Sequence, residues 1–159
     1  MTPTEVIQFA KKNKVEIVDL RFCDLPGLWQ HFSITMTQFD EDLFENGIGF
    51  DGSSIRGFQT IDQSDMLLFP DPDTAVLDPF SEQQSLIIFC DIVEPTNGQA
   101  YARDPRSAAK RAEEYVSTSG VGDATMFGPE PEFFVFDDVR YEVSMNNCFY
   151  SIDQREGPY

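Results

Sequence analysis

The sequence predicts an α+β fold, and three observations lead to this class. Helix-capping signals stand at Thr2-Pro3-Thr4-Glu5 and again at Asp104-Pro105, each followed by apolar residues at helical spacing. Between them, apolar and polar residues alternate after the turn Leu25-Pro26-Gly27-Leu28, as in a hairpin. Hydrophobic residues make up 41% of the 159 residues, and 15 of them are phenylalanine, which is enough for a packed core.

The first hundred residues carry the signals of a capped helix followed by a small sheet. The capping box at Thr2 and Glu5, with Pro3 at the first helical position, begins a helix expected within residues 1–14. A two-turn helix is expected over residues 39–46, closed by Gly47. Strands are expected over residues 15–22, 28–34, 66–69, 75–77 and 86–93. A hairpin, a helix and returning strands predict a β-grasp-like domain over residues 15–99.

A second domain is expected from residue 100 onward, after a linker at residues 95–98. Asp104 is the predicted N-cap of a helix that ends at Ser119-Gly120. Strands are then expected over residues 124–127, 132–137, 140–144 and 148–152. Because roughly 60 residues bury only a marginal core, residues 100–159 are expected to be the start of a larger domain.

Charge and composition exclude several classes of function. The formal net charge is -17, from 28 acidic and 11 basic residues, and it would repel nucleic acid and anionic membrane surfaces. Cys23, Cys90 and Cys148 are odd in number and widely spaced, which argues against a disulfide framework and a zinc knuckle. No apolar run reaches the roughly 18 residues of a membrane span, and no secretory pattern is present. We therefore expect a cytoplasmic protein.

Two residues that often serve in active sites are expected to be structural. His31 is the only histidine and falls in the middle of an expected strand, with no nearby catalytic partner in the sequence. Trp29 and the many phenylalanines are expected in the core.

Two glutamates alternate with prolines in Gly128-Pro129-Glu130-Pro131-Glu132. A residue before proline is pushed toward extended backbone, so the segment is expected to enter a strand with both carboxylates on one face, roughly 6.5 Å apart at the backbone. The apolar run Phe133-Phe134-Val135-Phe136 is expected to be covered on both faces. Such a pair suits one divalent cation or two neighbouring ones. A solvated pair at a strand end and the two carboxylates of a glycosidase are the alternatives.

The glycine-rich segment at residues 47–58 contains a literal G-x-G-x-x-G pattern. We exclude a dinucleotide site, because an acidic helix rather than a strand precedes it and Asp51 would lie where pyrophosphate binds. The segment instead predicts a sharply bent loop that presents one carboxylate and two hydroxyl groups, from Asp51, Ser53 and Ser54. A simple surface turn is the alternative.

Taken together, several segments resemble the amino-terminal part of bacterial-type (type I) glutamine synthetases. They are Phe50-Asp51-Gly52-Ser53-Ser54-Ile55, Ser64-Asp65-Met66, Thr74-Ala75-Val76-Leu77-Asp78-Pro79-Phe80, Arg103-Asp104-Pro105-Arg106-Ser107 and Gly128-Pro129-Glu130-Pro131-Glu132-Phe133-Phe134. The resemblance runs in order over almost the whole chain. It implies a β-grasp domain followed by the beginning of a catalytic domain.

The resemblance implies an ATP-dependent glutamate–ammonia ligase that forms glutamine through γ-glutamyl phosphate. Glu130 and Glu132 match the family's ligands for Mg²⁺ or Mn²⁺, and hard oxygen ligands suit both ions. Asp51 matches the loop aspartate that binds ammonium and takes its proton, with the Ser54 hydroxyl beside it. The expected substrates are glutamate, ammonium and ATP.

In the family, six subunits form a ring and two rings stack, with each active site shared between neighbouring chains. The resemblance therefore implies a homo-oligomer. Because the family's catalytic domain is much longer than residues 100–159, we expect a truncated synthetase that is inactive alone, with the ATP contacts largely beyond Tyr159. The alternative is a stand-alone β-grasp module that binds synthetase subunits.

Overall fold

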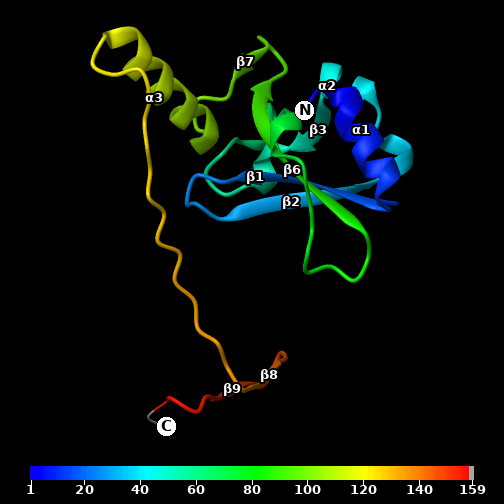
Figure 1. Cartoon of the computed structure of the whole chain (residues 1–159), viewed down its shortest axis with the longest axis vertical. Coiled ribbons are helices and arrows are strands. Elements are labelled where there is room, and N and C mark those ends of the chain that lie inside the picture. The colour runs from blue at the N-terminus through cyan, green and yellow to red at the C-terminus, as the bar shows by residue number, and fades with distance from the viewer. Residues whose placement is uncertain (158–159) are drawn as a thin grey trace. The chain divides into compact units, whose positions relative to one another are not determined.

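The computed structural model describes residues 1–157, which form two compact units divided between Thr125 and Met126. The first unit contains a seven-stranded sheet and three α-helices, and the second contains one hairpin (Figure 1). This division is based on contacts within the chain and lies after the domain boundary expected at residue 100. The expected boundary stays a prediction. None of the helices in the described range is long and apolar enough to cross a bilayer.

The sheet of the first unit has the strand order β2-β1-β6-β4-β3, with β5 and β7 also paired to β6. Strands β1 and β6 are parallel, and every other pair is antiparallel. The strands are β1 (Ile17–Cys23), β2 (Trp29–Thr35), β3 (Ile48–Asp51), β4 (Asp65–Pro70), β5 (Val76–Leu77), β6 (Ser85–Glu94) and β7 (Gln99–Ala100). The long strand β6 therefore holds the sheet together. The expected α+β class is confirmed.

Helices α1 and α3 begin where the capping signals predict, and α2 begins two residues later than expected, after Asp40 as its N-cap. In α1 (Pro3–Lys12), the Thr2 hydroxyl accepts from the Glu5 amide, and the Glu5 carboxylate accepts from the Thr2 amide. Helix α2 (Glu41–Asn46) ends at Gly47, whose φ of 71° is one that glycine adopts without strain. Helix α3 (Pro105–Ser119) has Asp104 as its N-cap. Short 3₁₀ turns lie at Met36–Gln38, Gly52–Ser54, Ile61–Gln63 and Pro72–Thr74.

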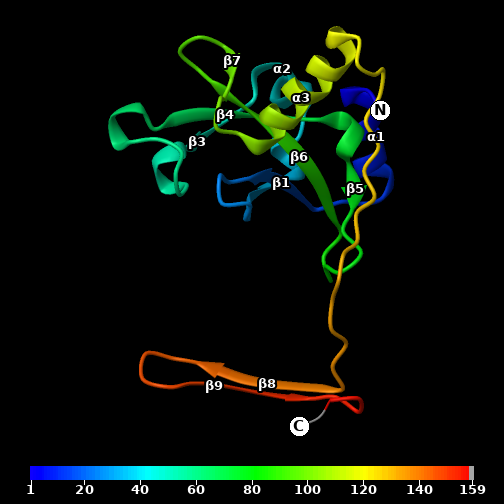
Figure 2. The same ribbon diagram turned by 90° about the vertical axis from the view of Figure 1, so that its left-hand side faces the viewer.

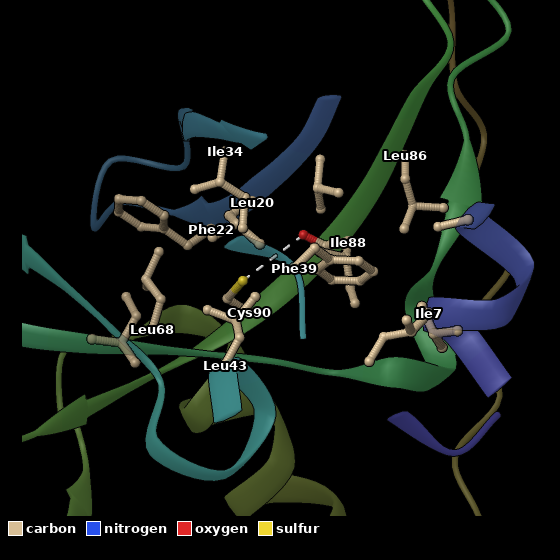
Figure 3. Close-up of a cluster of buried hydrophobic side chains, with 14 of the residues drawn as sticks. Ile7, Leu20, Phe22, Ile34, Phe39, Leu43, Leu68, Leu86, Ile88 and Cys90 are labelled. Atoms are coloured by element: carbon tan, nitrogen blue, oxygen red, sulfur yellow. Dashed lines mark hydrogen bonds between the residues drawn. The ribbon is translucent and has the colours of Figure 1, made fainter. Parts of the chain in front are cut away.

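The hydrophobic core lies on one face of the sheet and is covered by α1 and α2, which lie side by side. Alternate residues of β1 point into it, so Val18, Leu20 and Phe22 are buried. In Figure 3, Leu20 and Phe22 of β1 lie in the same cluster of buried side chains as Ile7 of α1 and Leu43 of α2. Cys90 also lies here, and none of the three cysteines is in a disulfide within the described part of the chain.

The opposite face of β1 and β2 is polar near its middle. The buried Asp19 carboxylate accepts hydrogen bonds from Arg21 Nε at 2.7 Å and Ser33 Oγ at 3.0 Å, and it pairs with His31 Nδ1 at 2.8 Å. The structural role expected for His31 agrees with this contact. The core position expected for Trp29 is wrong, because its side chain is 57% exposed and packs on Phe89 of β6 on the outer face.

The second unit contains a hairpin of β8 (Asp138–Val143) and β9 (Cys148–Asp153). The strands expected over residues 124–127 and 132–137 are wrong, since residues 124–136 have no regular secondary structure. The expected burial of the apolar run is also wrong, because Phe133 is 82% exposed and Phe134 is 80% exposed. A strand forms only where another strand accepts its hydrogen bonds, and none of the described residues pairs with this segment.

Candidate functional site

Asp51 is held at the end of β3 by the two serines that follow it. Its Oδ1 accepts from the Ser53 amide at 2.8 Å and the Ser53 hydroxyl at 2.6 Å, and its Oδ2 accepts from the Ser54 hydroxyl at 2.9 Å. These hydrogen bonds, the one from the Ser53 hydroxyl first, lower the pKa of Asp51 below its usual value. The carboxylate is therefore ionised at neutral pH, fixed in direction and exposed to solvent.

The backbone under this loop is fixed by a close contact between Gly52 and β4. The Gly52 amide donates to the Ser64 carbonyl at 2.6 Å, and the buried Gly52 lies against the Met66 side chain. A β-carbon at Gly52 would lie 2.5 Å from Met66 Sδ, so only glycine fits here without a shift. The sequence motif thus has a packing reason as well as a chemical one.

A groove of about 440 Å³ runs beside this loop. Its lining includes Asp51 and Asp65, which face each other across the β3–β4 pair, with Phe50, Met66 and Pro95 nearby. Two carboxylates on facing residues make this end of the sheet anionic and favour a cationic ligand. The position of Asp65 opposite Asp51 does not follow from the loop expected over residues 47–58, because a loop has no partner strand. If Ile48–Asp51 is recognised as a strand that pairs with the expected strand at residues 66–69, Asp65 is placed beside Asp51.

Glu130 and Glu132 lie in the second unit, whereas Asp51 lies in the first. Both are exposed, and their backbone belongs to the segment without regular structure. Further along this segment, the rings of Phe134 and Phe136 stack with centroids 6.1 Å apart. Residues two apart therefore share one face there, as expected for Glu130 and Glu132.

Carboxylates are the right donors for Mg²⁺ or Mn²⁺, but two are too few to enclose an ion. Among residues 1–157, no three His, Cys, Asp or Glu side chains gather as a metal site. Glu130 and Glu132 fit the expected ions as part of a ligand shell.

Curated relatives match the chain over nearly its full length. It is 52% identical over 156 residues to the glutamine synthetase of Methylococcus capsulatus, covering 98% of this chain and 33% of that protein. It is 50% identical over 159 residues to the glutamine synthetase of Vibrio cholerae, covering 100% of this chain and 34% of that protein. A 3-hydroxylaminophenol mutase of Cupriavidus pinatubonensis is 51% identical over 155 residues, with 98% and 33% covered. The chain thus spans about a third of the length of the curated relatives it matches.

A solved structure and two family models agree with these relatives. The cryo-electron microscopy structure of Plasmodium falciparum glutamine synthetase superposes with a TM-score of 0.73 at 28% identity, covering 98% of this chain and 30% of that one. Residues 14–95 match the family model described as the glutamine synthetase β-grasp domain. Residues 102–158 match the model of the glutamine synthetase catalytic domain. The β-grasp fold expected for the first part is confirmed, and the chain belongs to the glutamine synthetase family.

Proposed function

We propose that these residues serve an ATP-dependent glutamate–ammonia ligase, in which the Asp51 loop binds ammonium. The observation that carries this proposal is the geometry of Asp51 in a chain of this family. Its carboxylate is ionised, aimed by the Ser53 and Ser54 hydroxyl groups, and exposed beside an anionic groove.

The low pKa of Asp51 defines what its carboxylate can do. An ionised carboxylate holds ammonium by charge and hydrogen bonds, and it can accept one ammonium proton, which leaves ammonia with the lone pair that attack requires. The ammonia nitrogen then forms a bond to the γ-carbonyl carbon of γ-glutamyl phosphate, and the bond from that carbon to the phosphate oxygen breaks, which releases phosphate. Ser54 keeps one carboxylate oxygen in place during this transfer.

Glu130 and Glu132 are proposed as ligands of Mg²⁺ or Mn²⁺. When bound, these ions neutralise the charge of the ATP phosphates. Pro131 restricts its own backbone and that of the preceding Glu130, which lowers the entropy lost when the ions bind.

The proposed assembly is a cytoplasmic homo-oligomer in which rings of six subunits stack on each other. One face of the β8–β9 hairpin supports association, because its alternate residues are apolar or aromatic and exposed. They include Val139, Tyr141, Val143 and Tyr150. An isolated two-stranded hairpin is marginally stable in water, so this face needs a cover.

A chimeric enzyme tests the proposed activity. Residues 1–159 replace the matching third of the Methylococcus capsulatus synthetase, and glutamine is measured from glutamate, ammonium and ATP with Mg²⁺ or Mn²⁺. We expect activity in the chimera, and a loss of at least about 100-fold when Glu130→Gln and Glu132→Gln are combined. Asp123→Asn, an exposed acid outside both motifs, is the control. Undiminished turnover in the double variant would refute the metal role.

Two further outcomes separate the alternatives. A chimera that assembles like the parent enzyme and makes no glutamine would count against the synthetase proposal. The same protein is then assayed with 3-hydroxylaminophenol, because one relative bears the name of that mutase. For the stand-alone module, the 159-residue chain would capture intact synthetase subunits in a pull-down.

A further inference from the structure

The two ends of the Asp51 loop are packed on the same core side chain. Phe50 precedes Asp51 and Phe58 ends the loop, and their rings lie 5.0 Å and 6.4 Å from the ring of Phe22 in β1. Phe22 and Phe58 are both buried. In Figure 2 the segment between β3 and β4 extends beyond these strands, so such anchors are what fix it to the sheet.

A second set of contacts reaches the loop from the residues just before α3. The Tyr101 hydroxyl donates to the Phe58 carbonyl at 2.8 Å. Arg103 Nη1 donates to the Phe58 carbonyl at 3.0 Å and to the Gly57 carbonyl at 3.2 Å. The Tyr101 ring also meets Phe58 edge-on, with centroids 5.1 Å apart. Two donors thus converge on the last two carbonyl groups of the loop.

The donors themselves sit on fixed backbone. The Tyr101 amide donates to the Ile92 carbonyl of β6 at 2.8 Å, and the Tyr101 side chain is buried. Asp104, 1% exposed, caps α3 through the amides of Arg106 and Ser107. Arg106 joins Asp91 of β6 at 2.8 Å, so the start of α3 is tied to the sheet. The segment that carries Arg103 is therefore held at both ends.

Residues 55–58 of the loop have weak internal support. Its own backbone bonds are short-range, from Ile55 to Gly52 at 3.2 Å, Phe58 to Ile55 at 3.1 Å, and Gln59 to Gly52 at 3.4 Å. Gly57 has a φ of 83°, a backbone conformation that few other residues adopt. Bonds of this kind open readily unless outside groups hold the turn.

We propose that Tyr101 and Arg103 are positioning residues that lock the carbonyl end of the loop and thereby aim Asp51 at its ammonium ion. The functional part of this inference rests on the proposed function. Arg103 suits the task because one rigid guanidinium can bridge two carbonyl groups, whereas a lysine ammonium acts as a single point charge. Arg103 belongs to the catalytic-domain match, which begins at residue 102, whereas the loop belongs to the β-grasp match.

Amide hydrogen exchange of the 159-residue chain, followed by NMR, tests the lock without any assay of activity. In Arg103→Met we expect the protection of the Gly52, Ile55, Phe58 and Gln59 amides to fall about tenfold, as expected for a lost charged hydrogen bond. Tyr101→Phe keeps the ring and should lower it about fivefold. Arg103→Lys should restore part of the protection.

Arg111→Met is the matched control, since Arg111 lies in α3 and donates to the Ala102 carbonyl at 3.4 Å, away from the loop. In Arg111→Met, the loop amides should exchange as in the unchanged chain. The amides of β1 and β6 should exchange as in the unchanged chain in every variant. If Arg103→Met leaves the loop amides equally protected, the inference is wrong.

The chimeric synthetase then tests the link to ammonium. Arg103→Met should raise the KM for ammonium about tenfold and leave the KM for ATP unchanged, which a general loss of stability would not do. Faster loop exchange with an unchanged ammonium KM would overturn the positioning role. Faster loop exchange in a chimera that makes no glutamine would refute the proposed function and leave the lock itself standing.

Discussion

Replacement of Gly52 by alanine tests whether the packing under the Asp51 loop has been read correctly. The added β-carbon would lie 2.5 Å from Met66 Sδ, 2.8 Å from Met66 Cγ and 3.1 Å from the Ser64 carbonyl oxygen. Met66 is only 1% exposed and lies in the core, so its side chain has little free space to move into. The strand pair β3–β4 must therefore shift, or Met66 must leave its rotamer.

The magnitude follows from two opposing effects. Overpacking of this kind costs about 1–3 kcal/mol of unfolding free energy. Replacing glycine by alanine reduces the conformational entropy of the unfolded chain, which raises the unfolding free energy by about 0.4–1 kcal/mol. We expect Gly52→Ala to lower the unfolding free energy by about 1–2 kcal/mol, which is a fall of about 1 M in the urea midpoint.

Urea titration with tryptophan fluorescence is a suitable assay, because Trp29 is the only tryptophan and belongs to the first unit. Gly49→Ala is the matched control, since Gly49 lies in β3, which ends just before Gly52, and nothing lies within 4 Å of its would-be β-carbon. It should leave the midpoint unchanged or raise it slightly.

A midpoint for Gly52→Ala at or above that of Gly49→Ala would refute the reasoning. A double-mutant cycle adds a sharper criterion. Met66→Ala alone should cost about 2–5 kcal/mol, but it makes room for the new methyl group, so the double variant should cost less than the sum of the two. Strict additivity would show that Gly52 and Met66 do not meet.

Three further predictions concern the same chain. Asp104→Ala should lower the unfolding free energy by about 1–2 kcal/mol, because it leaves the buried Ser107 hydroxyl and two amides without their acceptor, and an unchanged urea midpoint would contradict this. Burial raises the pKa of Asp19, but hydrogen bonds from Arg21, His31 and Ser33 outweigh it and place the pKa below its usual 3.8. This carboxylate therefore adds stability that is complete above pH 3.8 and is lost as pH falls through the lowered pKa, so Asp19→Asn should flatten the acid limb of a stability–pH curve. The 159-residue chain should associate at micromolar concentration through its exposed apolar hairpin face, and a monomer in light scattering would count against this.

The helices could be predicted from the sequence because their signals are local. Thr2, Asp40 and Asp104 each accept a hydrogen bond from the first turn of the helix that follows, and no distant residue is needed for that contact. Strands β1, β2, β4 and β6 were also expected, since their apolar faces alternate or run continuously.

The errors arise where a partner strand decides the outcome. Residues 132–137 have the composition of a buried strand, but composition does not reveal whether another strand is present to pair with them. Strand β3 is the opposite case, because a partner strand is present and the local sequence does not indicate a strand. Gly47 and Gly49 are typical of a loop, but every residue of β3 pairs with β4.

The candidate site shows the same limit. The family resemblance implies that the Ser54 hydroxyl lies beside Asp51, and the structure brings them together. The bonds from Tyr101 and Arg103 to the loop join residues more than forty positions apart, and no local pattern indicates them.

The parallel pair of β1 and β6 has a consequence for how this protein is made. Ile17 is aligned with Ser85, so the centre of the sheet cannot close until the ribosome has released the chain through Glu94. Closing so large a loop is slow, and a two-stranded ribbon by itself is marginal in water. Until β6 has been made, the β1–β2 hairpin therefore exposes its apolar side, and the nascent chain is most prone to aggregation during that interval.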